Sequence, residues 1–115
     1  MKRPSVSLNL MPPEVINSTP RLYAQSELSA NEAIVHVHLF GPVGDFWLTE
    51  VAEDGTEGFG YIRLSSQPEN AELGYISITE LQELVDENFI AKKDLRFMIE
   101  RDLHWNKCTL ADVQS

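Results

Sequence analysis

Residues 33–64 read AIVHVHLFGPVGDFWLTEVAEDGTEGFGYIRL, and this stretch decides the fold class. β-Branched and aromatic residues, which favour the pleated surface of a sheet, gather in three short runs within it. Gly41–Gly44 and Asp54-Gly55 lie between the runs and are typical of tight turns. Because parallel neighbours need long crossover connections, runs this close together predict antiparallel pairing. The three predicted strands are Ala33–Phe40, Asp45–Val51 and Gly58–Leu64.

Side chains alternate between the two faces of a strand, so each run predicts which residues lie together. In the first strand, Val35, Val37 and Leu39 are expected on one face and His36 and His38 on the other. Two histidines that leave the same face of a sheet are the first candidate for a functional site.

The chain continues with a fourth predicted strand, Leu73–Ser77, and then with its most regular helical pattern, at about 78–88. Ser77 and Glu80 have the spacing of a capping box, in which the serine hydroxyl accepts a hydrogen bond from a helical N–H. Residues 98–105 alternate again and predict a last strand. The apolar face of the helix repeats at helical spacing and consists of Ile78, Leu81, Leu84 and Val85.

We therefore predict an α+β fold, in which one main helix packs on a mainly antiparallel sheet of four or five strands. Pro12-Pro13-Glu14 predicts a short N-terminal helix, because proline is tolerated in the first helical turn and an acid is favourable there. Residues 1–19 are expected to be a polar N-terminal segment that contains this helix. Residues 20–106 are expected to form a single domain, and residues 107–115 a C-terminal tail.

The chain has 115 residues, of which 18 are acidic and 9 basic, so its formal net charge is −9. This charge disfavours direct binding to nucleic acid, and it suits solubility or a protein partner with a basic surface. The lone cysteine, Cys108, forms no internal disulfide. Residues 1–4 begin like a signal peptide, but the apolar run that should follow is missing, and no run is long enough for a membrane helix. We therefore expect a cytoplasmic protein without a membrane anchor, and its oligomeric state stays open.

Short motifs follow one another in a characteristic order: Leu22-Tyr23-Ala24, Phe40-Gly41-Pro42, Trp47-Leu48-Thr49-Glu50, Phe59-Gly60-Tyr61, Glu72-Leu73-Gly74-Tyr75-Ile76-Ser77-Ile78-Thr79-Glu80-Leu81 and Ile99-Glu100-Arg101-Asp102-Leu103. In this order and spacing, which cover about residues 20–105, they are similar to the bacterial family catalogued as domain of unknown function 2958. The resemblance implies a small cytoplasmic protein that is often carried on plasmids, integrative elements or phages. It implies no activity, no catalytic residues and no cofactor, because none is established for that family.

His36 and His38 could share a zinc ion if His104, Asp102 or Cys108 supplied a further ligand, since imidazole, carboxylate and thiolate groups are common zinc ligands. The spacing of this third ligand is not diagnostic, so we assign no metal site and expect no cofactor. Glu100, Asp102 and His104 alternate on the last predicted strand, and a carboxylate there could orient His104 as a general base. The simpler interpretation is a polar, solvent-facing strand, and no catalytic residue is assigned.

Phe46 and Trp47 face opposite ways in the second strand, so one ring is expected at the surface, where an exposed aromatic residue can mark a protein interface. Acidic residues concentrate between positions 50 and 87, and along one surface they could imitate a phosphate backbone. Our leading hypothesis is an uncharacterised accessory protein that binds another protein. The alternatives are a metal-dependent or His-based hydrolase and a nucleic-acid-mimic inhibitor of a DNA-binding protein. The candidate partner-binding residues are Trp47, Glu50, Glu53, Asp54 and Glu57.

Overall fold

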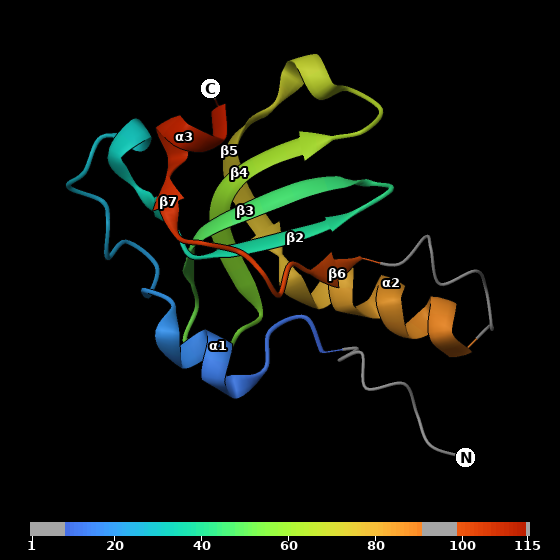
Figure 1. The fold of residues 1–115 in the computed structure, drawn as a ribbon. Helices are drawn as coiled ribbons and strands as arrows, with labels where there is room; N and C mark the ends of the chain where they lie inside the picture. Colours follow the sequence, from blue (N-terminus) through green and yellow to red (C-terminus); the bar gives the residue numbers. More distant parts are fainter. Residues whose placement is uncertain (1–8, 91–98, 115) are drawn as a thin grey trace.

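A five-stranded antiparallel sheet in the order β5-β4-β3-β2-β6 forms the centre of the fold (Figure 1). The structure is a computed structural model that describes residues 9–90 and 99–114. It confirms the predicted α+β class, with one main helix and a short N-terminal helix. The sheet strands are β2 (Val37–Gly41), β3 (Gly44–Val51), β4 (Glu57–Leu64), β5 (Glu72–Ser77) and β6 (Glu100–Arg101).

A second, two-stranded sheet joins distant parts of the chain, and short helices lie around both sheets. β1 (Ile34–Val35) pairs antiparallel with β7 (Cys108–Thr109). The α-helices are α1 (Pro13–Ser18), α2 (Ile78–Ile90) and α3 (Leu110–Gln114), and the 3-10 helices are η1 (Ala30–Glu32) and η2 (Pro68–Asn70). In the described part of the chain, no helix is both long enough and apolar enough to span a lipid bilayer.

The turn between β3 and β4 follows directly from its sequence. Gly55 has φ +75°, a left-handed conformation that side chains with a Cβ atom rarely adopt. The Asp54 carboxylate accepts hydrogen bonds from the backbone N–H and the hydroxyl of Thr56, at 3.0 and 2.7 Å. These two residues close the hairpin that the Asp-Gly pair predicts.

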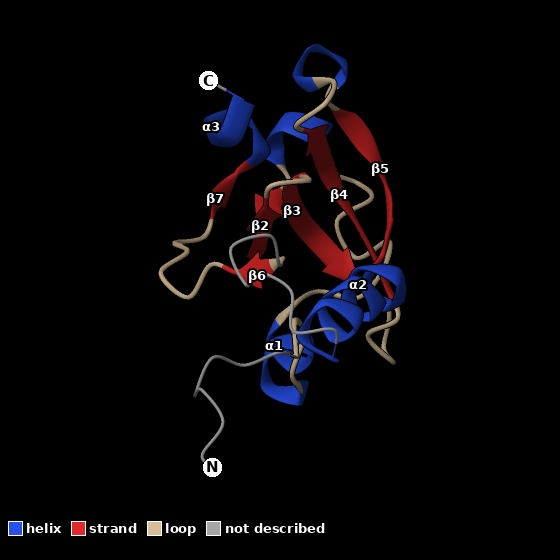
Figure 2. Cartoon of the chain, turned by 90° about the vertical axis from the view of Figure 1, so that its right-hand side faces the viewer, coloured by secondary structure: helices blue, strands red, loops and turns tan. Residues whose placement is uncertain are grey.

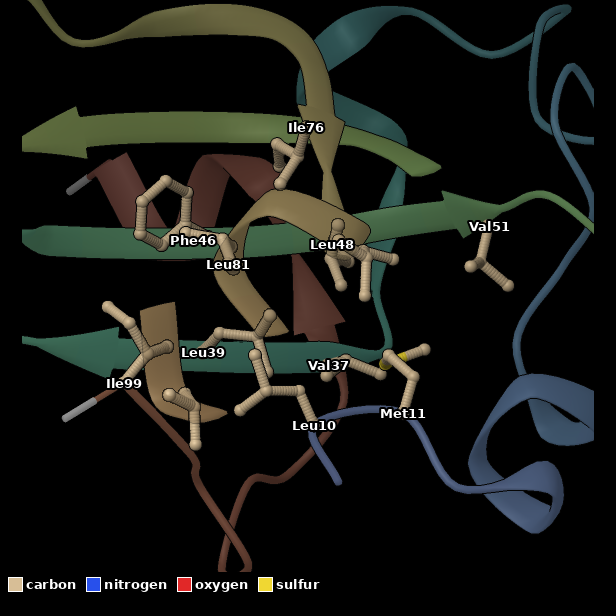
Figure 3. Packing of buried hydrophobic residues seen from close by; sticks show 12 residues of the cluster. Leu10, Met11, Val37, Leu39, Phe46, Leu48, Val51, Ile76, Leu81 and Ile99 are labelled. Atoms are coloured by element: carbon tan, nitrogen blue, oxygen red, sulfur yellow. The ribbon is translucent and has the colours of Figure 1, made fainter. Parts of the chain in front are cut away.

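One face of the large sheet, which we call the helical face, carries Val37, Leu39, Phe46 and Leu48 and packs against α2 (Figure 3). The Ser77 hydroxyl accepts a hydrogen bond from the backbone N–H of Glu80, as expected for the cap of α2. Three residues of the predicted apolar stripe, Ile78, Leu81 and Val85, are buried. The fourth, Leu84, is 46% exposed and lies outside this core.

The N-terminal segment completes the helical face. Leu10 and Met11 are buried in the same cluster and lie beside the sheet in Figure 3. The Gln82 side chain accepts a hydrogen bond from the N–H of Leu10, and the Arg101 guanidinium donates to the carbonyls of Asn9 and Leu10. The segment predicted to be polar therefore contributes two apolar residues to the core, held by contacts more than 70 residues away in the chain.

The opposite face, which we call the aromatic face, carries His38, Trp47, Tyr61 and Phe59. Figure 2 shows α3 and β7 on this side and α2 on the other. Part of the face is covered by a small cluster built from Val35, Trp47 and Leu110, with Tyr61, Trp105 and Val113 packed against it.

The C-terminal residues differ from the predicted tail. Residues 107–115 were expected to form a C-terminal tail, and within them Cys108–Thr109 forms β7 and Leu110–Gln114 forms α3. Leu110 is fully buried, and its N–H donates to the carbonyl of Ala33 at 2.8 Å. A five-residue helix has too few turns to leave a periodic pattern, so its docking is visible only in the tertiary structure.

The predicted alternation of the first strand is broken at His36. The N–H of His36 donates to the carbonyl of Leu48, while Val37 is paired with the same residue, so two residues oppose one. Such a bulge changes which face the preceding residues point to. Val35 consequently packs with Trp47 on the aromatic face, not with Val37.

The last predicted strand, 98–105, is much shorter in the structure. Only Glu100–Arg101 pairs with β2, and Met98 lies outside the described residues. The chain then turns at Asp102, whose carbonyl accepts a hydrogen bond from the N–H of Trp105 at 3.3 Å.

Candidate functional site

A groove of about 280 Å³ lies on the aromatic face, between the loop 21–33 and strands β3, β4 and β5. We call it the edge groove, because β5 is an edge strand of the sheet. Apolar side chains form most of its walls, and a carboxylate, a carboxamide and two phenols lie among them. The lining residues are Leu22, Tyr23, Gln25, Ser26, Leu28, Ser29, Ala30, Ala33, Thr49, Glu50, Phe59, Leu73, Tyr75 and Leu110.

The loop is held against the sheet by the buried carboxylate of Glu50. One carboxylate oxygen accepts a hydrogen bond from the backbone N–H of Tyr23 at 2.7 Å, and the other from that of Gln25 at 2.8 Å. Only 6% of Glu50 is exposed. Charge-assisted hydrogen bonds of this kind are stronger than neutral ones, so Glu50 fixes the loop conformation.

The Gln25 side chain provides the second anchor. Its carboxamide nitrogen donates to the carbonyls of Ile34 and Thr49, at 3.1 and 2.9 Å, and its oxygen accepts from the N–H of Ile34 at 2.7 Å. The Gln25 side chain thus bridges backbone groups of β1 and β3, as the backbone of a neighbouring strand would do. This arrangement satisfies backbone groups that the loop itself does not reach.

A β-bulge in β3 brings Glu50 to the groove. Leu48 pairs with Gly60 and Glu50 pairs with Phe59, so Thr49 is an extra residue between two paired positions. In a regular strand Glu50, two residues after Leu48, would point to the helical face, because side chains alternate along a strand. The bulge therefore determines that a carboxylate lies on the aromatic face.

Two local contacts hold the bulge. The Thr49 hydroxyl donates a hydrogen bond to the carbonyl of Phe59 at 3.1 Å. Gly60 allows the two strands to approach closely, because a Cβ atom at this position would collide with the carbonyl of Trp47. Thr49 is thus part of the sheet structure.

Two tyrosines form the rim of the groove. The hydroxyls of Tyr23 and Tyr75 are 2.9 Å apart and hydrogen-bonded, and the ring of Tyr75 packs edge-on against Phe59 at 5.2 Å. Tyr23 has φ +73°, a strained backbone conformation for a residue with a large side chain. The hydrogen bond to Tyr23 raises the pKa of Tyr75, and the nearby carboxylates of Glu57 and Glu50 add to this effect.

Exposed apolar residues concentrate around the edge groove. Of the eight large hydrophobic residues that are exposed in the described part of the chain, four line it: Tyr23, Leu28, Leu73 and Tyr75. No lysine, arginine or histidine is among its lining residues. The groove is therefore an apolar hollow with an anionic group at its base.

A second cluster on the aromatic face is centred on His38. Its Nε2 atom lies 2.8 Å from a carboxylate oxygen of Asp45, and its Nδ1 atom lies 3.2 Å from one of Asp102. Arg63 forms an ion pair with the other oxygen of Asp45 at 3.0 Å, and its guanidinium lies over the ring of Trp47.

The rings around His38 hold it in place. The imidazole is stacked nearly parallel on Trp47, with ring centroids 5.2 Å apart, and it also contacts Phe40 and Trp105. The hydrogen bond from His38 lowers the pKa of Asp102. Since both ring nitrogens are engaged, His38 has no nitrogen available to accept a proton from a substrate in this conformation.

The three histidines do not come together. His36 lies at the bulge, where burial lowers its pKa and Lys107 lowers it further. His104 is exposed, and its backbone N–H donates to the Asp102 carboxylate. In residues 9–90 and 99–114, no group of three or more histidine, cysteine, aspartate and glutamate side chains is arranged to hold a metal ion.

The candidate partner-binding residues divide into two groups. Trp47 and Glu50 are buried, at 7% and 6% exposed, so neither lies on the surface. Glu53, Asp54 and Glu57 are exposed on the hairpin between β3 and β4. Phe46 is buried as well, so neither neighbouring ring is at the surface, because a cluster covers each face of β3.

Three comparisons with known proteins gave no match for this chain: no family model, no curated protein and no solved structure is similar to it. The resemblance to the domain of unknown function 2958 family therefore stays a prediction from the motifs themselves. Sequence reasoning missed the edge groove, although a signal was present. Leu73 and Tyr75 alternate with Glu72 and Gly74, which is the pattern of a strand with an apolar side chain at every second position.

Proposed function

We propose that this protein is a non-enzymatic accessory protein that acts in the cytoplasm by binding another protein through the edge groove. The observation that carries the proposal is the concentration of Tyr23, Leu28, Leu73 and Tyr75, all exposed, around one preformed hollow. Exposed apolar residues gathered in one patch are typical of interaction sites, and aromatic residues often contribute most of the binding energy.

The size of the groove supports a partner's side chains over a free small molecule. Its volume of about 280 Å³ is at the lower end of the range for small-molecule pockets. Two of its lining residues, Leu73 and Tyr75, lie on the edge strand β5 and are exposed, so a partner that fills the groove can also contact this strand. A protein segment would fill the groove with one or two side chains and cover the rim with others.

The charge of the site supports a partner with basic groups. Glu50 is among the residues that line the groove, Glu57 is close enough to raise the pKa of Tyr75, and none of the described lining residues is a cation. With a formal net charge of −9, the protein attracts basic surfaces at long range.

The two alternatives gain less support. In the hydrolase hypothesis His38 would need a free ring nitrogen, and both of its nitrogens face carboxylates. In the nucleic-acid-mimic hypothesis the acids would line one surface. Glu50 is buried, and the others are divided among the hairpin, η2, β5 and α2.

Selection from a display library of random peptides on the purified protein tests the proposal. We expect enriched peptides that combine an aliphatic or aromatic residue with lysine or arginine. Leu73→Ser should weaken their binding at least about tenfold, because the apolar wall of the groove is lost. Leu64→Ser is the matched control, since Leu64 is 40% exposed, close to the 37% of Leu73, but does not line the groove. Enrichment without a common pattern, or equal losses in the two variants, would contradict the proposal.

A further inference from the structure

The two edges of the large sheet are protected to different degrees. β6 has two residues, and the guanidinium of one of them, Arg101, donates hydrogen bonds to the carbonyls of Asn9 and Leu10. β5 has six residues, and its pairing with β4 runs without irregularity from Ser77 to Glu72. No strand among the described residues pairs with its outer side, and in Figure 2 β5 bounds the sheet.

β5 lacks the features by which proteins usually protect an edge strand. Its sequence, ELGYIS, contains no proline and no lysine, and it carries no bulge. Every second residue of an edge strand directs its N–H and C=O groups away from the sheet, where they can pair with another backbone. Leu73 and Tyr75 are exposed at alternate positions on the side that faces the edge groove. The edge therefore offers backbone hydrogen bonds and apolar contacts side by side.

The residues that precede and follow β5 in the chain carry charge of one sign only. Residues 64–91 contain no lysine and no arginine. Glu72 is exposed on the strand itself, Glu57 pairs with Ser77 at the other end, and Glu80 follows in the first turn of α2. An extended segment that lies along this edge would meet carboxylates at both ends of the strand.

We propose that β5 binds an extended, positively charged segment of a partner protein, which adds a sixth strand to the sheet and places apolar side chains, at every second position, against Leu73 and Tyr75. This inference rests on the proposed function and gives it a binding mode. Strand addition at an open edge supplies affinity through the backbone, and the side chains supply specificity. A second copy of this chain is disfavoured as the occupant, because two antiparallel β5 strands would bring Glu72 of each copy towards the acidic end of the other.

Two matched libraries of octapeptides test the charge of the partner. In the first, lysine or arginine alternates with aliphatic residues, and in the second, glutamate takes the basic positions. We expect binding from the basic library only, an affinity that falls as salt is added, and a lower affinity for Glu72→Gln. Equal binding of the acidic library would overturn the proposed charge preference. Sedimentation should show a monomer at high protein concentration, and a dimer abolished by Leu73→Ser would identify a second copy as the occupant instead.

Methylation of single backbone nitrogens in the strongest-binding basic peptide tests the strand mode. A strand added to β5 donates from every second residue, so we expect losses of at least about tenfold at alternate positions and small effects at the positions between them. Losses without this two-residue period would overturn strand addition. If such a peptide still depended on Leu73, the proposed function would hold without this mode. If no peptide from either library or from the random selection required Leu73, both proposals would fail.

Discussion

The two faces of the sheet are buried by different means. Among the described residues, twelve buried hydrophobic residues form the cluster on the helical face, whereas three form the cluster on the aromatic face. The aromatic face is completed by polar contacts: the carboxylates on His38, the anchors Gln25 and Glu50, and the hydrogen bond from Trp105 to Val35. It also leaves the edge groove open. The comparison teaches that the helical face provides most of the stability, while the aromatic face positions groups that can bind.

Truncation of a core side chain should break the helical face with the largest effect. Leu39 lies on β2 and is fully buried in the hydrophobic cluster of the helical face. We expect Leu39→Ala to lower the free energy of unfolding by about 2–5 kcal/mol, because it removes buried contacts and leaves a cavity. Leu73→Ala on the aromatic face should change it by less than about 0.5 kcal/mol, since Leu73 is exposed. Urea denaturation of both variants measures the difference. Equal losses in the free energy of unfolding would contradict the conclusion that the helical face provides most of the stability.

Loss of the loop anchor should weaken the aromatic face by a smaller amount. Glu50→Gln keeps the shape of the side chain but replaces one accepting oxygen by an N–H₂ group that faces a backbone donor. We expect a loss of about 1–3 kcal/mol in the free energy of unfolding. Faster amide exchange at Tyr23 and Gln25 should accompany it. Glu53→Gln, at an exposed carboxylate, is the control, and unchanged exchange at the two amides in Glu50→Gln would refute the anchor.

The smallest expected effect on the aromatic face is a pH-dependent change in stability that comes from Asp102. The hydrogen bond from His38 lowers the pKa of Asp102, so the stabilisation by Asp102 is fully present above its unfolded-state pKa and is lost as pH falls through the lower folded-state pKa. Near neutral pH the free energy of unfolding of the wild type should exceed that of Asp102→Asn by less than about 1 kcal/mol. This difference should vanish in acid. Thermal unfolding of both proteins, from about pH 2 to pH 6, measures it. A difference in the free energy of unfolding that stays constant with pH would argue against a hydrogen bond that stabilises the ionised carboxylate of Asp102.

Prediction from the sequence succeeded where a pattern repeats over many residues. The strands β3, β4 and β5 and the helix α2 were expected within a few residues of their observed bounds, because periods of two and 3.6 residues are properties of one continuous segment. α3 was missed because five residues complete too few turns to show a period. Leu10 and Met11 were assigned to a polar segment because two apolar residues alone predict no burial.

The candidate site could be predicted only in part, for a reason that Glu50 and His36 illustrate. His36 was assigned to a face by strict alternation along a strand, and Glu50 was expected to be a partner-binding residue. Each lies at or next to a bulge, where an extra residue changes the side on which neighbouring side chains lie. A bulge depends on which residues pair across strands, and that information is not contained in the strand itself.

Local sequence is sufficient for the α+β class, the Asp54-Gly55 turn, the cap of α2 and the acidic character of residues 64–91. The position of Glu50 under the loop, the two carboxylates on His38 and the open edge beside the groove are decided by the tertiary structure. The physical reason is range. Turns, caps and periodicity arise from interactions within a few residues. The contacts of Glu50 with the loop and of Asp102 with His38 instead join residues 25–64 positions apart, and the open edge requires that no described strand pairs with the outer side of β5.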